Sequence, residues 1–224
     1  MTRTAGTIVS VNVGRAREIQ WQGQPLRSAI WKAPVAGPVR LADGRVEGDT
    51  QANPDVHGGT YKAVYAYDAA DLAWWAAELG LGLAQGTPRE LAPGTFGENL
   101  TLAGLDVSGA LIGERWAAGE AELEVTGPRV PCSKLGARMG DTGFPRRFVA
   151  AERPGAYLRV VTAGTVAAGD EIRVVHRPAG GPSVAEVSRI YHAERWRAAE
   201  LLQVPGLDPV WGEWARHRLE RAPG

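Results

Sequence analysis

The residue with the clearest chemical potential is Cys132, the only cysteine in the 224-residue chain. Pro128 and Pro131 precede it, and two cations, Arg129 and Lys134, flank it. The prolines fix the backbone angle φ and stiffen the segment. The nearby cations favour the thiolate, which is the nucleophilic and metal-binding form of cysteine. A buried and inert cysteine is the alternative, but flanking charge this close favours a reactive thiol or a soft metal ligand.

A second segment combines a histidine, two glycines and a lysine. His57-Gly58-Gly59 is followed closely by Lys62. A glycine turn brings backbone N–H groups close to a bound group, as in anion-binding nests. His57 could be a metal ligand, an acid or base, or a donor to an anionic cofactor, and Lys62 could pair with a phosphate. The alternatives are a histidine that ties the loop to a carbonyl group and a solvated lysine.

A third segment, Gly97-Glu98-Asn99, leads into the apolar run that begins at Leu100. It offers a carboxylate acceptor and a side-chain amide in a tight turn. The alternative is a turn in which Asn99 bonds to its own backbone. By itself the segment does not distinguish the two interpretations.

Short strands must position these three segments. In residues 9–13 three valines alternate with Ser10 and Asn12, and residues 121–126 alternate in the same way. The chain has 29 glycines and 15 prolines, which break these runs and supply tight corners. Many short strands of this kind predict a mainly β fold, with a closed sheet or barrel over residues 1–178.

A single helix is expected among these strands. Asp68 is a suitable N-cap, the following apolar residues have helical spacing, and Gly80 would end the helix. The longest apolar run, residues 72–84, includes Glu78 and is too short to span a bilayer. We therefore expect no membrane association.

The pattern becomes helical after residue 178. A Pro- and Gly-rich linker at residues 178–182 precedes Ser183 and Glu186, which form a capping-box signature. A second helix is expected over residues 197–204. A third helix would begin with Asp208 as N-cap and a proline at its first position. Residues 182–224 are therefore predicted to form a small three-helix domain.

The overall composition narrows the function. The chain has 25 acidic and 25 basic residues, so no global field attracts nucleic acid or a membrane surface. A single cysteine excludes an internal disulfide framework and a multi-cysteine iron–sulfur site. The first residues lack an apolar signal core. We expect a cytoplasmic globular protein that acts on a small molecule.

Taken in order, these segments resemble the MOSC family, named for the molybdenum-cofactor sulfurase C-terminal domain, and within it the YiiM-type, hydroxylaminopurine-reducing subgroup. The resemblance covers residues 6–177, and the tail from Ser183 resembles the three-helix extension of that subgroup. It is carried by Ser28-Ala29-Ile30 with Lys32, Val46-Glu47-Gly48-Asp49, Val56-His57-Gly58-Gly59, Lys62-Ala63-Val64-Tyr65, Phe96-Gly97-Glu98-Asn99-Leu100, and Pro128-Arg129-Val130-Pro131-Cys132 followed by Lys134-Leu135.

The resemblance implies a strand-rich barrel that holds a molybdenum cofactor, a pterin dithiolene with a phosphate. It gives Cys132 the role of metal ligand and catalytic residue, and a soft thiolate suits such a metal. The residues implied to bind the cofactor are Lys32, His57, Gly58, Gly59, Lys62, Glu98, Asn99, Arg129, Ser133 and Lys134. The implied reaction is the reduction of N-hydroxylated bases or related compounds, with the redox step carried by the cofactor.

Electrons for that reaction would come from a separate partner, because one cysteine cannot hold the iron–sulfur domain that some relatives carry. A flavoprotein or a ferredoxin-type protein would serve. The C-terminal helices could be its docking surface or could form a homodimer. Two other functions stay open: a non-catalytic carrier of the cofactor or of sulfur that uses Cys132, and a cysteine enzyme without metal.

Overall fold

A computed structural model describes residues 4–42, 44–51, 59–80 and 91–221. Within these residues, seven strands form a closed sheet, because the first and last strands also pair with each other. In order around the barrel they are β13 (Glu171–His176), β9 (Arg115–Ala118), β10 (Ala121–Pro128), β11 (Ala156–Thr162), β7 (Val64–Asp68), β8 (Leu100–Ala103) and β1 (Ala5–Val13). The β7–β8 pair is parallel and the other pairs are antiparallel. The predicted barrel is confirmed.

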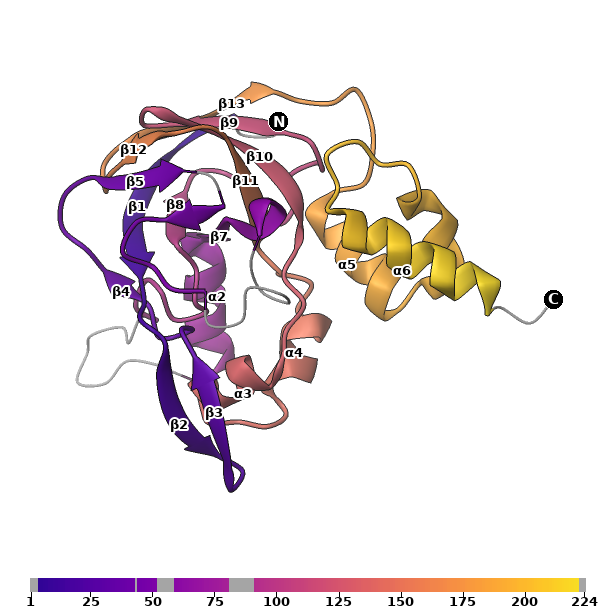
Figure 1. The fold of residues 1–224 in the computed structure, drawn as a ribbon, viewed down its shortest axis with the longest axis horizontal. Helices are drawn as coiled ribbons and strands as arrows, with labels where there is room; N and C mark the ends of the chain where they lie inside the picture. The colour runs from indigo at the N-terminus through magenta and orange to yellow at the C-terminus, as the bar shows by residue number, and fades with distance from the viewer. Residues whose placement is uncertain (1–3, 43, 52–58, 81–90, 222–224) are drawn as a thin grey trace.

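Short elements are added to this barrel. The additional strands are β2 (Arg17–Trp21), β3 (Gln24–Ser28), β4 (Ala33–Pro34), β5 (Val39–Ala42), β6 (Arg45–Val46) and β12 (Gly164–Val166). The helices are the 3₁₀ helix η1 (Thr60–Lys62), α2 (Ala69–Glu78), α3 (Ser133–Met139), α4 (Phe144–Ala150), α5 (Val184–His192), the 3₁₀ helix η2 (Arg195–Leu201) and α6 (Pro209–Glu220). Figure 1 shows the β2–β3 hairpin projecting from the barrel and the C-terminal helices lying along one side of it.

The first strand, β1, differs from its expected pattern. The alternation in residues 9–13 predicts a half-buried strand. Val11 is buried, but Val9 is 44% exposed and the polar Ser10 and Asn12 are also buried. The register of β1 against β8 shifts between Ile8 and Ser10, and such a bulge rotates the following side chains. Ser10 donates to Asn12 Oδ1 at 2.8 Å, and Asn12 Nδ2 donates to the Thr101 hydroxyl at 3.1 Å. These bonds let polar residues occupy the interior.

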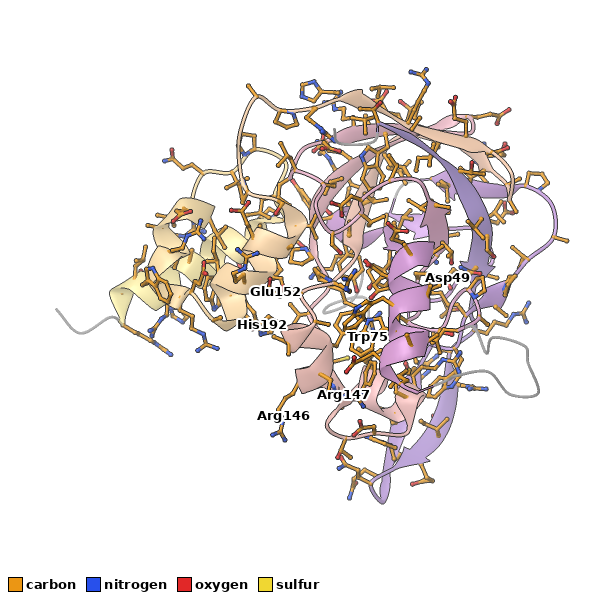
Figure 2. The ribbon with its side chains drawn as sticks, turned by 180° about the vertical axis from the view of Figure 1, so that it is seen from behind. Asp49, Trp75, Arg146, Arg147, Glu152 and His192 are labelled. Carbon is orange, nitrogen blue, oxygen red and sulfur yellow. The ribbon has the colours of Figure 1, made fainter. Side chains whose placement is uncertain are left out.

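Helix α2 forms where the sequence predicts it. Asp68 accepts a hydrogen bond from the Ala70 N–H at 2.8 Å, and Gly80 has a φ of +65°, as expected for the residue that ends a helix. Trp75 on this helix is buried and stacks on Phe148 of α4 at 6.0 Å. In Figure 2 Trp75 lies between α2 and the turn of α4 that carries Arg146 and Arg147. The helix is thereby packed against α4.

The C-terminal elements agree with the sequence at their caps and differ in the middle. Both reciprocal bonds of the Ser183 and Glu186 capping box are present, and Asp208 caps α6. The helix expected over residues 197–204 is present as the 3₁₀ helix η2, which begins two residues earlier and ends at Leu201. In a 3₁₀ helix residues three apart are aligned, and Arg197 pairs with Glu194 and Glu200 at that spacing.

The apolar core continues from the barrel into the C-terminal helices. Val187 of α5, Leu201 of η2 and Trp211 of α6 belong to the same buried cluster as the barrel strands. Glu152, after α4, pairs with Arg189 of α5 at 3.2 Å, and Figure 2 shows Glu152 and His192 at this junction. The division into two domains at residues 178–182 stays a prediction. No helix in the described part of the chain is long and apolar enough to cross a membrane.

Candidate functional site

An open cavity of about 100 Å³ lies where the ends of several barrel strands meet the loops between them. It collects six of the residues that the sequence predicts for the site: Lys32, Lys62, Asn99, Arg129, Cys132 and Lys134. Gly59, Glu98 and Ser133 are described but do not line it. His57 and Gly58 lie outside the described residues. Segments far apart in the chain therefore meet in one cavity.

Cys132 reaches the cavity because strand β10 ends at Pro128 and helix α3 begins at Ser133. It is the N-cap residue of α3 in an extended conformation, with φ −134° and ψ 179°, and its side chain makes no capping bond. The residue is half-buried, and its thiol is free of any disulfide. A thiol in this position can contact a group bound in the cavity.

Arg129 is buried beside Cys132. One end of its guanidinium donates to the Phe96 carbonyl oxygen, and its Cζ lies 5.1 Å from the centre of the Tyr65 ring. Its Nε–H is buried and has no hydrogen-bond partner among the described residues. A buried donor without a partner costs free energy, so a bound acceptor in the cavity would relieve this cost.

Asp49 holds together the side of the cavity that contains Lys32 and Asn99. Its carboxylate accepts from the Gly14 N–H at 2.7 Å, from Asn99 Nδ2 at 2.9 Å, and from the Lys32 ammonium. Burial lowers the pKa of Lys32 below its ordinary value of 10.5, and the Asp49 carboxylate, which raises it, offsets this only in part. Asn99 also accepts from the Tyr65 N–H at 3.1 Å. Lys32 and Asn99 are thus held by one carboxylate.

Two of the four cations that line the cavity have a carboxylate partner among the described residues, and two do not. Lys32 pairs with Asp49, and the Lys62 ammonium lies 3.5 Å from Asp208. Arg129 and Lys134 have no carboxylate partner within the described ranges of the chain. The uncompensated positive charge therefore lies next to Cys132, where it can bind an anion.

Glu98 stabilises the turn that precedes β8. Its carboxylate is fully buried and accepts from the Gly94 N–H at 2.6 Å, the Phe96 N–H at 3.0 Å and the Thr101 hydroxyl at 3.1 Å. Burial raises the pKa of Glu98, while the surrounding donors lower it by less. These bonds fix the loop whose Phe96 carbonyl holds Arg129. A direct contact of Glu98 with a cofactor stays a prediction.

Replacing Glu98 by glutamine tests this structural role. The amide would turn an NH₂ group toward N–H donors, so we expect a loss of about 1–3 kcal/mol in the free energy of unfolding. Chemical denaturation followed by circular dichroism measures it. The exposed Glu120 accepts from Thr165, and Glu120→Gln should change stability by no more than about 0.5 kcal/mol. A Glu98→Gln variant as stable as the parent would contradict the assignment.

The sequence did not single out every residue that the cavity uses. Asp49 stands in a motif that carries the family resemblance, but nothing in the sequence shows that it pairs with Lys32. Tyr65 and Tyr157 line the cavity from the paired strands β7 and β11. Tyrosines are common in the core of strands whose residues alternate between polar and apolar. The only feature of the sequence that pointed to a role in the site was therefore the position of Tyr65 shortly after Lys62.

Comparison with known proteins identifies the family. Residues 53–173 match the model of the MOSC domain. The chain is 33% identical to protein YiiM of Escherichia coli over 85% of this chain and 83% of that protein. It is 32% identical to a protein of Gibberella moniliformis named reductase, over 99% of this chain and 39% of that protein. The crystal structure of YiiM from Geobacillus stearothermophilus superposes with a TM-score of 0.77 at 31% identity, covering 96% of this chain and 99% of that one. The chain therefore belongs to the MOSC domain family and fits its YiiM-type subgroup.

Proposed function

We propose that the cavity binds a molybdenum cofactor and that the protein reduces N-hydroxylated bases or related compounds. The observation that carries this proposal is the pairing of a free thiol, Cys132, with two cations, Arg129 and Lys134, that have no carboxylate partner among the described residues. A pterin dithiolene cofactor is anionic at its phosphate and at its metal. The unpartnered Nε–H of Arg129 fits the same kind of ligand.

The residues of this chain would then have distinct roles. The Cys132 thiolate would ligate the metal, as a soft ligand. Arg129 and Lys134 would neutralise the anionic groups, and Asp49 would keep Lys32 and Asn99 on their side of the cavity. When bound, the cofactor supplies a redox-active metal that can accept oxygen from the substrate. The protein would bind and orient both the cofactor and the substrate.

Electrons would reach the site from another protein. Reduction of an N-hydroxyl group to an amine consumes two electrons and two protons and releases water. The chain has a single cysteine, so it cannot hold a four-cysteine iron–sulfur cluster of its own. We propose a flavoprotein or ferredoxin-type donor. The fungal relative named reductase supports the reaction class and is much longer, since this chain spans 39% of it.

The test begins with the protein purified from a host that makes molybdenum cofactor. We expect molybdenum and pterin in amounts close to one per chain, and reduction of 6-N-hydroxylaminopurine with reduced methyl viologen as electron donor. Full cofactor content without turnover of any N-hydroxylated compound would favour a carrier of the cofactor. A folded protein that neither contains nor takes up the cofactor would overturn the proposal.

A further inference from the structure

We propose that Asp208, in the C-terminal helical segment, is a positioning residue of the cavity, because it holds the Lys62 ammonium in place. The inference rests on the proposed function in one respect: it assigns Lys62 to the binding of an anion. It goes further because it makes the segment after the linker part of the site, although the cavity itself is lined by residues of the barrel portion.

The ion pair is the first observation. Lys62 Nζ lies 3.5 Å from Asp208 Oδ2, and the two side chains are only 22% and 13% exposed. The other carboxylate oxygen of Asp208 accepts from the Val210 N–H at 3.1 Å and so begins helix α6. One side chain therefore ties the start of a C-terminal helix to a lysine that lines the cavity.

The backbone around this pair is fixed by Thr126 of strand β10. The Thr126 carbonyl accepts from the Asp208 N–H at 2.9 Å, and its hydroxyl donates to the Tyr61 carbonyl at 2.5 Å. Tyr61 immediately precedes Lys62, so both members of the ion pair are anchored to the same buried residue. Anchored backbones reduce the entropy that the pair loses on forming.

Packing of helix α6 against strand β10 is a further contact between the C-terminal helices and the cavity. A methyl group at Gly127, where φ is +154°, would come within 2.9 Å of Trp211 Nε1. The buried Trp211 ring of α6 therefore lies directly against the strand that continues to Arg129 and Cys132. Two sides of the cavity thus have separate supports. Asp49 holds Lys32 from the part of the barrel away from the C-terminal helices (Figure 2), and Asp208 holds Lys62 from those helices.

A thiol-labelling experiment measures the position of Lys62 without any cofactor. Cys132 is the only cysteine, so its alkylation rate reports on the cavity alone. Iodoacetate is an anion and iodoacetamide is neutral, so the ratio of their rates reports the local positive potential. The variants are Lys62→Met, Asp208→Asn and the double variant. Asparagine is as good an N-cap as aspartate, so α6 should still form.

If Asp208 positions Lys62, the effect of Lys62→Met depends on Asp208. We expect Lys62→Met to lower the rate ratio by about threefold or more in the parent, and by much less in the Asp208→Asn background. An equal effect in both backgrounds would overturn the proposal. A larger effect with Asp208→Asn would also overturn it, because Asp208 would then only neutralise the lysine.

Two controls complete the design. Glu220→Gln removes a negative charge from the exposed far end of α6, where Glu220 faces His217, and should leave the effect of Lys62→Met unchanged. If the Asp208→Asn variant does not fold, the Asp208→Ser variant is used in its place, because serine also supplies an oxygen that can cap the helix. Because the labelling uses protein without cofactor, its outcome is separate from the cofactor content that tests the proposed function.

Discussion

Replacing Cys132 by alanine is expected to remove molybdenum from the purified protein and to abolish reduction of N-hydroxylated substrates. Loss of a residue that only orients a metal ligand costs about 10–100-fold in affinity or activity, so loss of the ligand itself should exceed that range. Molybdenum analysis, the EPR spectrum of the partly reduced protein and turnover with an artificial donor measure the three effects.

The fold should survive this change. Cys132 makes no capping bond, is half-buried and has no disulfide. We expect a change of about 0.5 kcal/mol or less in the free energy of unfolding, as at other sites without special contacts. The Cys132→Ser variant is a less clean test than Cys132→Ala, because an alkoxide or water could replace the ligand in part. A Cys132→Ala protein with parental molybdenum content and activity would exclude Cys132 from the site.

Local chemistry explains which parts of the fold the sequence predicts. Caps depend on neighbouring residues, so Asp68, the Ser183 and Glu186 box, and Asp208 were predictable and are confirmed. The burial of Ser10 and Asn12 in β1 was not, because the bulge before Ser10 depends on the pairing of β1 with β8. Likewise, η2 forms where ion pairs three residues apart match a 3₁₀ turn, and helical periodicity alone does not distinguish this.

In the site, too, the sequence predicts what neighbouring residues determine and does not predict what depends on tertiary contacts. Cys132, Arg129 and Lys134 lie in one short segment, so the sequence brought them together correctly. Glu98 also has the residue type of a binding group, but its carboxylate is occupied by the N–H groups of its own turn. Asp49 is distant in sequence from the asparagine and the glycine that it binds, so only the tertiary structure shows that it is the centre of a network.

Replacing Asp49 by alanine is expected to give the largest loss of stability at the site. The change removes the acceptor of the Gly14 N–H and of Asn99 Nδ2 and leaves the Lys32 ammonium without its counter-charge. The side chains of the ion pair are 9% and 7% exposed. Breaking a buried pair on one side costs about 3–5 kcal/mol, because a charge remains buried alone. Denaturant titration at pH 7 measures the loss.

Two further measurements identify the buried charge as the cause. Adding Lys32→Met to Asp49→Ala removes the unpaired ammonium, so the double variant should be more stable than Asp49→Ala alone. The pKa of Lys32 is already lowered below 10.5 by burial, so the unfolded chain holds its proton to higher pH than the folded chain does. The stability of Asp49→Ala should therefore rise as the pH increases toward 10.5, and fall as the pH decreases through the lowered pKa. If Lys32→Met gave no recovery and the loss were the same at every pH, the cost would come from the Gly14 and Asn99 hydrogen bonds, and Asp49 would act as a scaffold rather than as the counter-charge of Lys32.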